Sequence, residues 1–202
     1  PIQGAGGVII PPKTYWPEVA RILKARNILF VSDEVICGYG RLGTWFGCDY
    51  FGTEPDMMTT AKGLSSGYLP IGAVLIGKRV ADVFLDKGGE INHGFTYAGH
   101  PVCCAVALRN IQMIQDEQLV ERVRDDIGPY MQKKWRALAG HPLIGEAVIE
   151  GLIGALQLTR LLTEDPERTV GEVMDTDVAG IPPGAPATEV ASLFQDRDLV
   201  SA

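Results

Sequence analysis

A short apolar run that ends in two carboxylates constrains the fold of this chain more than any other feature. Residues 28–31 read Ile-Leu-Phe-Val, without the alternation of a strand that has one wet face. Such a run is typical of a parallel strand buried on both faces. It is followed by Ser32, Asp33 and Glu34, so we expect a carboxylate at the carboxyl end of a central strand. Ligands bind at that edge in open α/β sheets.

Helical and strand patterns alternate along the first part of the chain. Residues 12–27 have helical apolar spacing, and residues 71–76 are a second apolar run that we expect to be a buried strand. Helices are expected over residues 79–86, from Pro101 onward, and over residues 119–138. One face of the helix that begins at Pro101 carries Cys104, Leu108, Ile111 and Gln115. The alternation predicts an α/β fold with a largely parallel sheet.

Two other segments have a different sequence pattern. Residues 38–56 contain six glycines and prolines and are expected to form a loop, whereas residues 144–156 have the pattern of a β-hairpin. We therefore expect the large α/β part to occupy residues 1–140. Residues 141–159 are then a junction or the start of a smaller domain.

Composition excludes several classes of protein. The chain has 202 residues, a formal net charge of −7 and 46% hydrophobic residues. The negative charge argues against a nucleic-acid surface, because phosphate binding depends on Lys and Arg. No apolar run reaches the roughly 18 residues of a membrane span, and no leader pattern opens the chain, so a cytoplasmic protein is expected. The four cysteines form no C-x-x-C pair, so no metal site is expected.

Lys62 is the second candidate for a catalytic residue, after the carboxylate at the strand end. It is flanked by small and apolar residues, Thr60-Ala61 before it and Gly63-Leu64 after it. Burial there would lower the pKa of the lysine and make it a better nucleophile. A carboxylate at a strand end and a lysine on a loop are the two protein groups that pyridoxal phosphate chemistry needs. The lysine amine forms a Schiff base, and the carboxylate keeps the pyridinium nitrogen protonated.

The blocks around these two residues resemble the class III aminotransferases, the ω-transaminase group with the type I pyridoxal phosphate fold. The resemblance covers residues 1 to about 158 and is carried by residues 1–7, 30–35, 60–64, 67–73 and 94–101. It implies a partial type I large domain and transfer of an amino group from an amine or amino acid to a keto acid. It also implies a homodimer, and the absence from this chain of an N-terminal part that carries the phosphate cradle and the stacking aromatic residue.

The resemblance assigns roles residue by residue. Lys62 corresponds to the Schiff-base lysine, and Asp33 to the partner of the pyridinium nitrogen. Val35 corresponds to the residue packed on one ring face, and Thr96 to the threonine that contacts the cofactor phosphate of the neighbouring subunit. Each has a simpler alternative: Asp33 as a turn cap, Lys62 as a solvated lysine, Val35 as a core residue and Thr96 as a hydroxyl satisfied within its loop. Arg41 is expected to have a structural role. Glu34 is expected to be an interface carboxylate or one that supports the residues of the site, with a solvated carboxylate as the alternative.

The last forty residues have a different pattern. Residues 160–202 resemble the start of a CBS domain of bacterial magnesium transporters, carried by residues 170–178, 181–183 and 189–194. The alternative is a divergent aminotransferase tail. The resemblance implies an incomplete α/β CBS-like segment, so we expect a composite or incomplete chain with little activity alone. The alternative function is a non-enzymatic or regulatory composite with a nucleotide-sensing segment.

Overall fold

A computed structural model describes residues 1–5, 7–88, 90, 93–141 and 144–158. Pro1–Leu138 together with Ala147–Ala155 form one compact unit, and this unit contains both Asp33 and Lys62. The other described residues, 139–141, 144–146 and 156–158, belong to a second unit, which includes the first residues of strand β4 and the last residues of strand β5. Within the described residues, no helix is long and apolar enough to cross a membrane.

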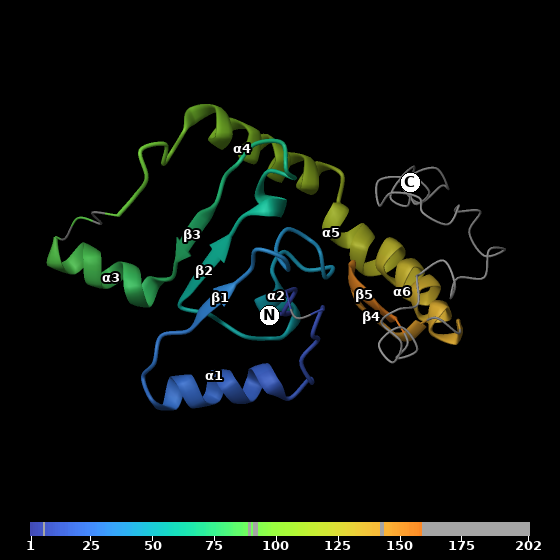
Figure 1. Ribbon diagram of the computed structural model, residues 1–202. Helices are drawn as coiled ribbons and strands as arrows, with labels where there is room; N and C mark the ends of the chain where they lie inside the picture. The colour runs from blue at the N-terminus through green and yellow to red at the C-terminus, as the bar shows by residue number, and fades with distance from the viewer. Residues whose placement is uncertain (6, 89, 91–92, 142–143, 159–202) are drawn as a thin grey trace, which may run out of the picture. The chain divides into compact units, whose positions relative to one another are not determined.

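The sheet that carries Asp33 has three short strands. They are β1 (Val31–Asp33), β2 (Met57–Thr60) and β3 (Ala73–Ile76), and β2 lies between the other two (Figure 1). β1 pairs with β2 in parallel, whereas β2 pairs with β3 antiparallel. The α/β class is therefore confirmed, but the expected parallel arrangement holds only for the β1–β2 pair. β2 was not predicted, because its sequence Met-Met-Thr-Thr is neither a long apolar run nor an alternating one.

The expectation that these strands are buried on both faces is wrong for the described structure. Phe30 and Ser32 are buried, but Leu29 and Val31 on the opposite face are about half exposed. All four residues of β3 are exposed, Val74 at 60%. For β1 the reason is one-sided cover: Phe30 packs against Trp16 of helix α1 (Tyr15–Ala25), and no described element covers the other face. The exposure of all four residues of β3 shows that neither of its faces is covered within the described structure. An apolar run identifies residues that favour burial, and it does not show what buries them.

The helices follow the sequence pattern closely. Helix α3 (Lys78–Lys87) ends at Gly88, which has the left-handed conformation (φ +60°) that glycine adopts without strain. Helix α4 (Pro101–Asp116) begins with proline at its first position, as expected. The segment predicted as one helix is a continuous helical run made of α5 (Leu119–Arg122), a π-helical turn (Val123–Ile127) and α6 (Gly128–Ala137).

The buried face of α4 differs from the face that its apolar residues suggest. The buried positions are Ala107 and Ile114, and Leu108 is 68% exposed. Asn110 lies between the two buried residues on the same helical face, three positions after one and four before the other. A polar residue in the middle of the buried stripe displaces the face inferred from apolar residues alone.

The predicted loop and hairpin are both present. Residues 38–56 are irregular except for a single helical turn, α2 (Gly47–Tyr50), and strands β4 (Ile144–Glu150) and β5 (Ile153–Leu158) form a two-stranded sheet. The hairpin turn contacts the loop: the Leu152 amide donates to the Arg41 carbonyl at 2.9 Å. Gly151 (φ +55°) lies against that same carbonyl, so an added Cβ would clash. Ile2, Cys37, Leu42 and Ile153 form a small hydrophobic core here.

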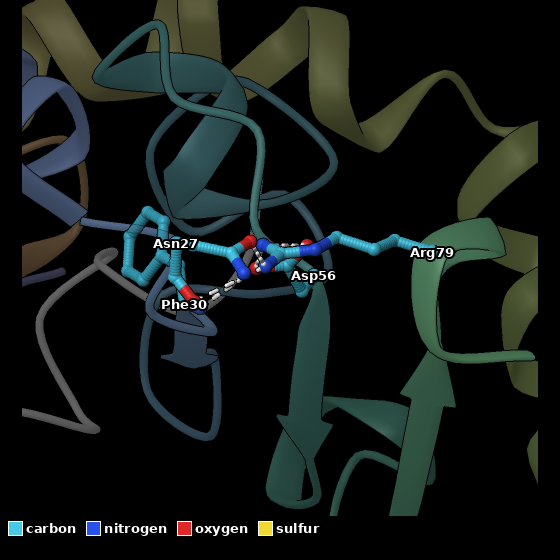
Figure 2. A network of polar contacts seen from close by, with 4 residues as sticks. All are labelled: Asn27, Phe30, Asp56 and Arg79. Atoms are coloured by element: carbon cyan, nitrogen blue, oxygen red, sulfur yellow. Dashed lines mark hydrogen bonds and ion pairs between the residues drawn. The ribbon is translucent and has the colours of Figure 1, made fainter. Parts of the chain in front are cut away.

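Asp56 connects the strand entry to helix α3. Its Oδ2 accepts the Phe30 amide at 2.8 Å, and both of its carboxylate oxygens accept from the Arg79 guanidinium. Arg79 also donates to the side-chain oxygen of Asn27, so the four residues form one network (Figure 2). The Asp56 side chain is 16% exposed and the Arg79 side chain is 43% exposed, so the bond to the Phe30 amide is partly shielded from water whereas the bonds of Arg79 are open to it. The network fixes the backbone that leads into β1.

We expect Asp56→Ala to lower the free energy of unfolding by about 1–3 kcal/mol, because it leaves the part-buried Phe30 amide without its acceptor and also removes the ion pair with Arg79. The measurement is urea unfolding followed by circular dichroism. Asp82→Ala is the matched control, because the exposed Asp82–Lys78 pair contributes at most about 0.5 kcal/mol. Equal losses in the two variants would contradict a special role for Asp56.

Candidate active site

Asp33 and Lys62 line one cavity of about 770 Å³. Val35 lies on the same wall, and residues from the N-terminal segment together with Trp16 of α1 form much of the rest. The structure therefore brings together three of the four residues that the sequence nominated. A carboxylate, an amine and an apolar side chain around one cavity are the groups that a charged aromatic ring with an aldehyde requires, so the described residues fit pyridoxal phosphate.

Asp33 is positioned by the end of β1. Its Oδ1 accepts the backbone amide of Val35 at 3.0 Å, which is the turn-capping interaction that was the alternative to a cofactor role. The two interpretations are compatible, because this bond uses one oxygen and the side chain is exposed toward the cavity. The cap fixes the direction of the carboxylate.

Lys62 stands on a strained backbone. It opens the single 3₁₀ turn η1 (Lys62–Leu64) with φ +39°, a region that non-glycine residues avoid. Such a conformation costs about 1–3 kcal/mol and persists only when its surroundings impose it. The side chain is exposed, so the burial considered in the sequence analysis is not found. The strain, rather than burial, distinguishes Lys62 from an ordinary surface lysine.

Two side chains hold the turn that carries Lys62. A Cβ added to Gly63 would lie 3.1 Å from Tyr39, and the Tyr39 hydroxyl donates to Thr60 Oγ1 at 3.1 Å. On α4, the Asn110 amide donates to the carbonyls of Gly63 and Leu64. Sequence reasoning missed both residues. The available signal for Asn110 was a polar residue within the buried face of a helix.

A second cavity of about 530 Å³ also reaches Lys62. It shares Val35, Ile36 and Lys62 with the first and is otherwise lined by the loop at Arg41, the turn after Gly63 and the hairpin residues 152–154. Lys62 thus borders two spaces. Arg41 supports this wall through its backbone carbonyl, which agrees with the structural role expected for it.

Glu34 is fully buried and has three donors. Its Oε2 accepts the amide of Gly47 at 2.7 Å, and its Oε1 accepts the amide of Cys48 and the hydroxyl of Ser32. The solvated and interface alternatives for Glu34 are therefore wrong, whereas the alternative of a carboxylate that supports the site agrees with its buried place next to Asp33. The side chain fastens helix α2 to the end of β1, because the free amides at the start of a helix need acceptors. An added Cβ at Gly47 would lie 3.0 Å from Glu34 Oε2.

Thr96 lies apart from the other three residues. It is exposed and, within the described structure, contributes to neither cavity. Its neighbours Phe95 and Tyr97 are more than 80% and about 80% exposed. The resemblance assigns Thr96 to the cofactor of a neighbouring subunit, and its exposed position leaves that role a prediction.

Two buried cysteines, Cys37 and Cys48, lie near the Glu34 carboxylate. Burial raises the pKa of the Cys37 thiol, and burial together with the charges of Glu34 and Asp49 raises the pKa of Cys48 to about 12. The pKa of Tyr50 is also raised to about 12, by burial and by its hydrogen bond to Glu150. These groups stay neutral at neutral pH, which agrees with buried cysteines that pack as small apolar residues.

The comparisons with known proteins identify the family. The family model described as Aminotransferase class-III matches residues 1–187, so the chain belongs to the class III aminotransferases. The chain is 54% identical over 160 residues to the putrescine–pyruvate aminotransferase of Pseudomonas aeruginosa, covering 79% of this chain and 35% of that protein. It is 49% identical over 162 residues to the chloroplastic gamma aminobutyrate transaminase 3 of Solanum lycopersicum, covering 79% and 31%.

Solved structures agree with this assignment. The (S)-enantioselective omega-transaminase of Thermomicrobium roseum has a TM-score of 0.74 and 43% identity, over 79% of this chain and 35% of that one. The chain thus spans about a third of the length of the relatives it matches. The aminotransferase part of the predicted resemblance is confirmed.

The predicted CBS-like tail has no support from these comparisons. The class III family model extends to residue 187 and so includes much of the segment 160–202. That segment lies outside the described residues. The domain boundaries at 140 and 159 stay predictions.

We expect Glu34→Gln to lower the free energy of unfolding by about 1.5–3 kcal/mol, because an amide group would face the amides of Gly47 and Cys48 and leave a buried donor unpaired. Urea unfolding is the measurement. Glu117→Gln, at an exposed position on the C-terminal side of α4, is the control and should change stability by less than about 0.5 kcal/mol. A Glu34→Gln protein as stable as the control would show that the carboxylate is not the anchor.

We expect Cys48 to resist alkylation by iodoacetamide at pH 8 in the folded protein and to react after urea unfolding, because only the thiolate is nucleophilic. A pKa of about 12 leaves on the order of one molecule in ten thousand as thiolate at that pH. Peptide mass spectrometry gives the extent of reaction.

The same shift has a consequence for stability. An unfolded thiol ionises near pH 8.5, so the stability gained from the neutral thiol is complete below that pH. It is lost as the pH rises toward 12, and the titration of Tyr50 acts in the same direction. A free energy of unfolding that rises between pH 9 and 11 would contradict the assignment.

Proposed function

We propose that this chain carries the lysine and the acid of a pyridoxal-phosphate-dependent class III aminotransferase, which moves an amino group from an amine or amino acid to a keto acid. One observation supports this above the others: Asp33, Val35 and Lys62 line a single cavity. Membership of the class III family makes the assignment specific. The family is dependent on pyridoxal phosphate as a general property.

In this proposal each residue has a separate task. The Asp33 carboxylate, held by its bond to the Val35 amide, pairs with the ring nitrogen and keeps a proton there. Val35 packs against one face of the ring. The Lys62 amine holds the cofactor covalently at rest and carries a proton at its Nζ during turnover. When bound, the cofactor supplies an electron sink for the substrate carbon.

The relatives suggest the class of amino donor. Putrescine and gamma-aminobutyrate, which appear in the names of the relatives, both carry a primary amine on an unbranched carbon chain. We infer a donor with such a terminal amine and pyruvate as an acceptor. An assembly of two copies is part of the proposal, with Thr96 directed to the cofactor phosphate of the second copy. A cytoplasmic location stays a prediction.

We expect the purified chain incubated with pyridoxal phosphate to develop the visible absorbance of a lysine-linked cofactor, and Lys62→Ala to abolish it, because no other lysine lines the cavity with Asp33 among the described residues. Reduction with borohydride followed by peptide mapping should place the label on Lys62. Putrescine or gamma-aminobutyrate should then discharge the band in unreduced protein.

Lys78→Ala is the control, because Lys78 is an exposed lysine paired with Asp82 on α3, and it should keep the band. Label spread over several lysines, or a band that persists in Lys62→Ala, would refute the proposal. That outcome would favour the non-enzymatic alternative.

A further inference from the structure

One side chain from helix α4 holds the backbone of the turn that carries Lys62. The Asn110 Nδ2 group donates to the Gly63 carbonyl at 2.8 Å and to the Leu64 carbonyl at 3.1 Å. The Ser66 hydroxyl donates to the Asn110 Oδ1 at 2.7 Å. Both ends of the amide are therefore engaged with residues 63–66, and Ser66 sets the orientation in which the NH₂ group faces the two carbonyls.

The position of Asn110 on α4 explains why it reaches this turn. Ala107 and Ile114 are the buried residues of the helix, and Asn110 shares their face. Ala107 and Ile114 are buried and hold the helix in place, and the Asn110 amide between them donates to backbone carbonyls. Aspartate has nearly the same shape but no donor when ionised, so it would place negative charge against two carbonyl oxygens.

The turn is held from two sides. Tyr39 contacts Gly63 on one side, so closely that an added Cβ would approach it at 3.1 Å. Asn110 holds the carbonyls by hydrogen bonds, and the strained Lys62 (φ +39°) begins the turn. A left-handed lysine relaxes when its restraints are removed. The hydrogen bonds of Asn110 are the restraint that a single substitution can remove without changing the cavity wall.

We infer that Asn110 is a positioning residue, which keeps Lys62 in the conformation that directs its amine into the cavity with Asp33. The inference rests on the proposed function, because the task of the amine is taken from it. Asn110 lines neither cavity among the described residues, so it acts through the backbone of Gly63 and Leu64.

The test compares three variants of the full chain. Asn110→Asp removes the donors, Ser66→Ala removes only the bond that orients the amide, and Gln112→Glu is the matched control. Gln112 lies on the same helix, and its amide donates to Asp116 at an exposed site. Two quantities are measured for each: amide hydrogen exchange of residues 62–66 without cofactor, and the rate at which pyridoxal phosphate becomes linked to Lys62. Thermal unfolding reports whether each variant is folded.

We expect Asn110→Asp to slow linkage at least tenfold, since a displacement of about 1 Å can cost roughly a hundredfold in rate. Exchange in residues 62–66 should become faster while the rest of α4 is unchanged. Ser66→Ala should show the same two changes at about fivefold, the effect of one hydrogen bond, and it decides the question if Asn110→Asp fails to fold. Gln112→Glu should match the unsubstituted chain.

The two readouts separate this inference from the proposed function. If the unsubstituted chain links no cofactor, the proposed function fails, and the inference falls with it even if exchange responds to Asn110→Asp. If the unsubstituted chain links cofactor and the Asn110→Asp and Ser66→Ala chains link it at the same rate, the proposed function stands and the positioning role is overturned. Unchanged exchange in residues 62–66 of both variants would also overturn it.

Discussion

The buried carboxylate of Glu34 is the interaction on which the site depends. A charged group without water is stable only when hydrogen-bond donors surround it, and Glu34 has two backbone amides and one hydroxyl. These bonds join the end of β1 to helix α2, and the Gly38 amide adds a further bond to the Glu34 carbonyl. The backbone that leaves β1 is thereby fixed. The same bonds fix the position of the Asp33 backbone, which lies one residue earlier.

Local patterns predicted most of the regular elements, with strand β2 and helix α2 as exceptions, and the two central site residues. Proline at the start of α4 and glycine after α3 marked helix ends, because both act through backbone geometry that the sequence itself determines. Asp33 and Lys62 could be paired because a carboxylate and a lysine amine are the two protein groups that pyridoxal phosphate chemistry needs. The exposed faces of β1 and β3 could not be predicted, because burial depends on what packs against a strand.

The backbone contacts of Glu34 and of Asn110 were not predicted, for a common physical reason. A polar residue in a pattern is expected to face solvent, and the sequence does not show which backbone groups will lie nearby. Glu34 meets the amides of α2 thirteen and fourteen positions later, and Asn110 meets carbonyls more than forty positions earlier. Such pairings follow from the folded path of the chain. The clue that remains in the sequence is a polar side chain where an apolar one would fit the pattern.

The alternation of Ser32, Asp33 and Glu34 between buried and exposed positions has a consequence for how this region can change over evolution. Successive side chains in a strand point to opposite faces, so one residue inserted or deleted before Asp33 would turn Asp33 toward the buried face and Glu34 toward the exposed face. The Asp33 carboxylate would then leave the cavity, and the Glu34 carboxylate would lose its bonds to the amides of α2. Substitutions in residues 28–31 alter the packing gradually. An insertion or deletion of one residue there would remove both the buried contacts of Glu34 and the cavity position of Asp33. The length of this segment is therefore constrained more tightly than its composition.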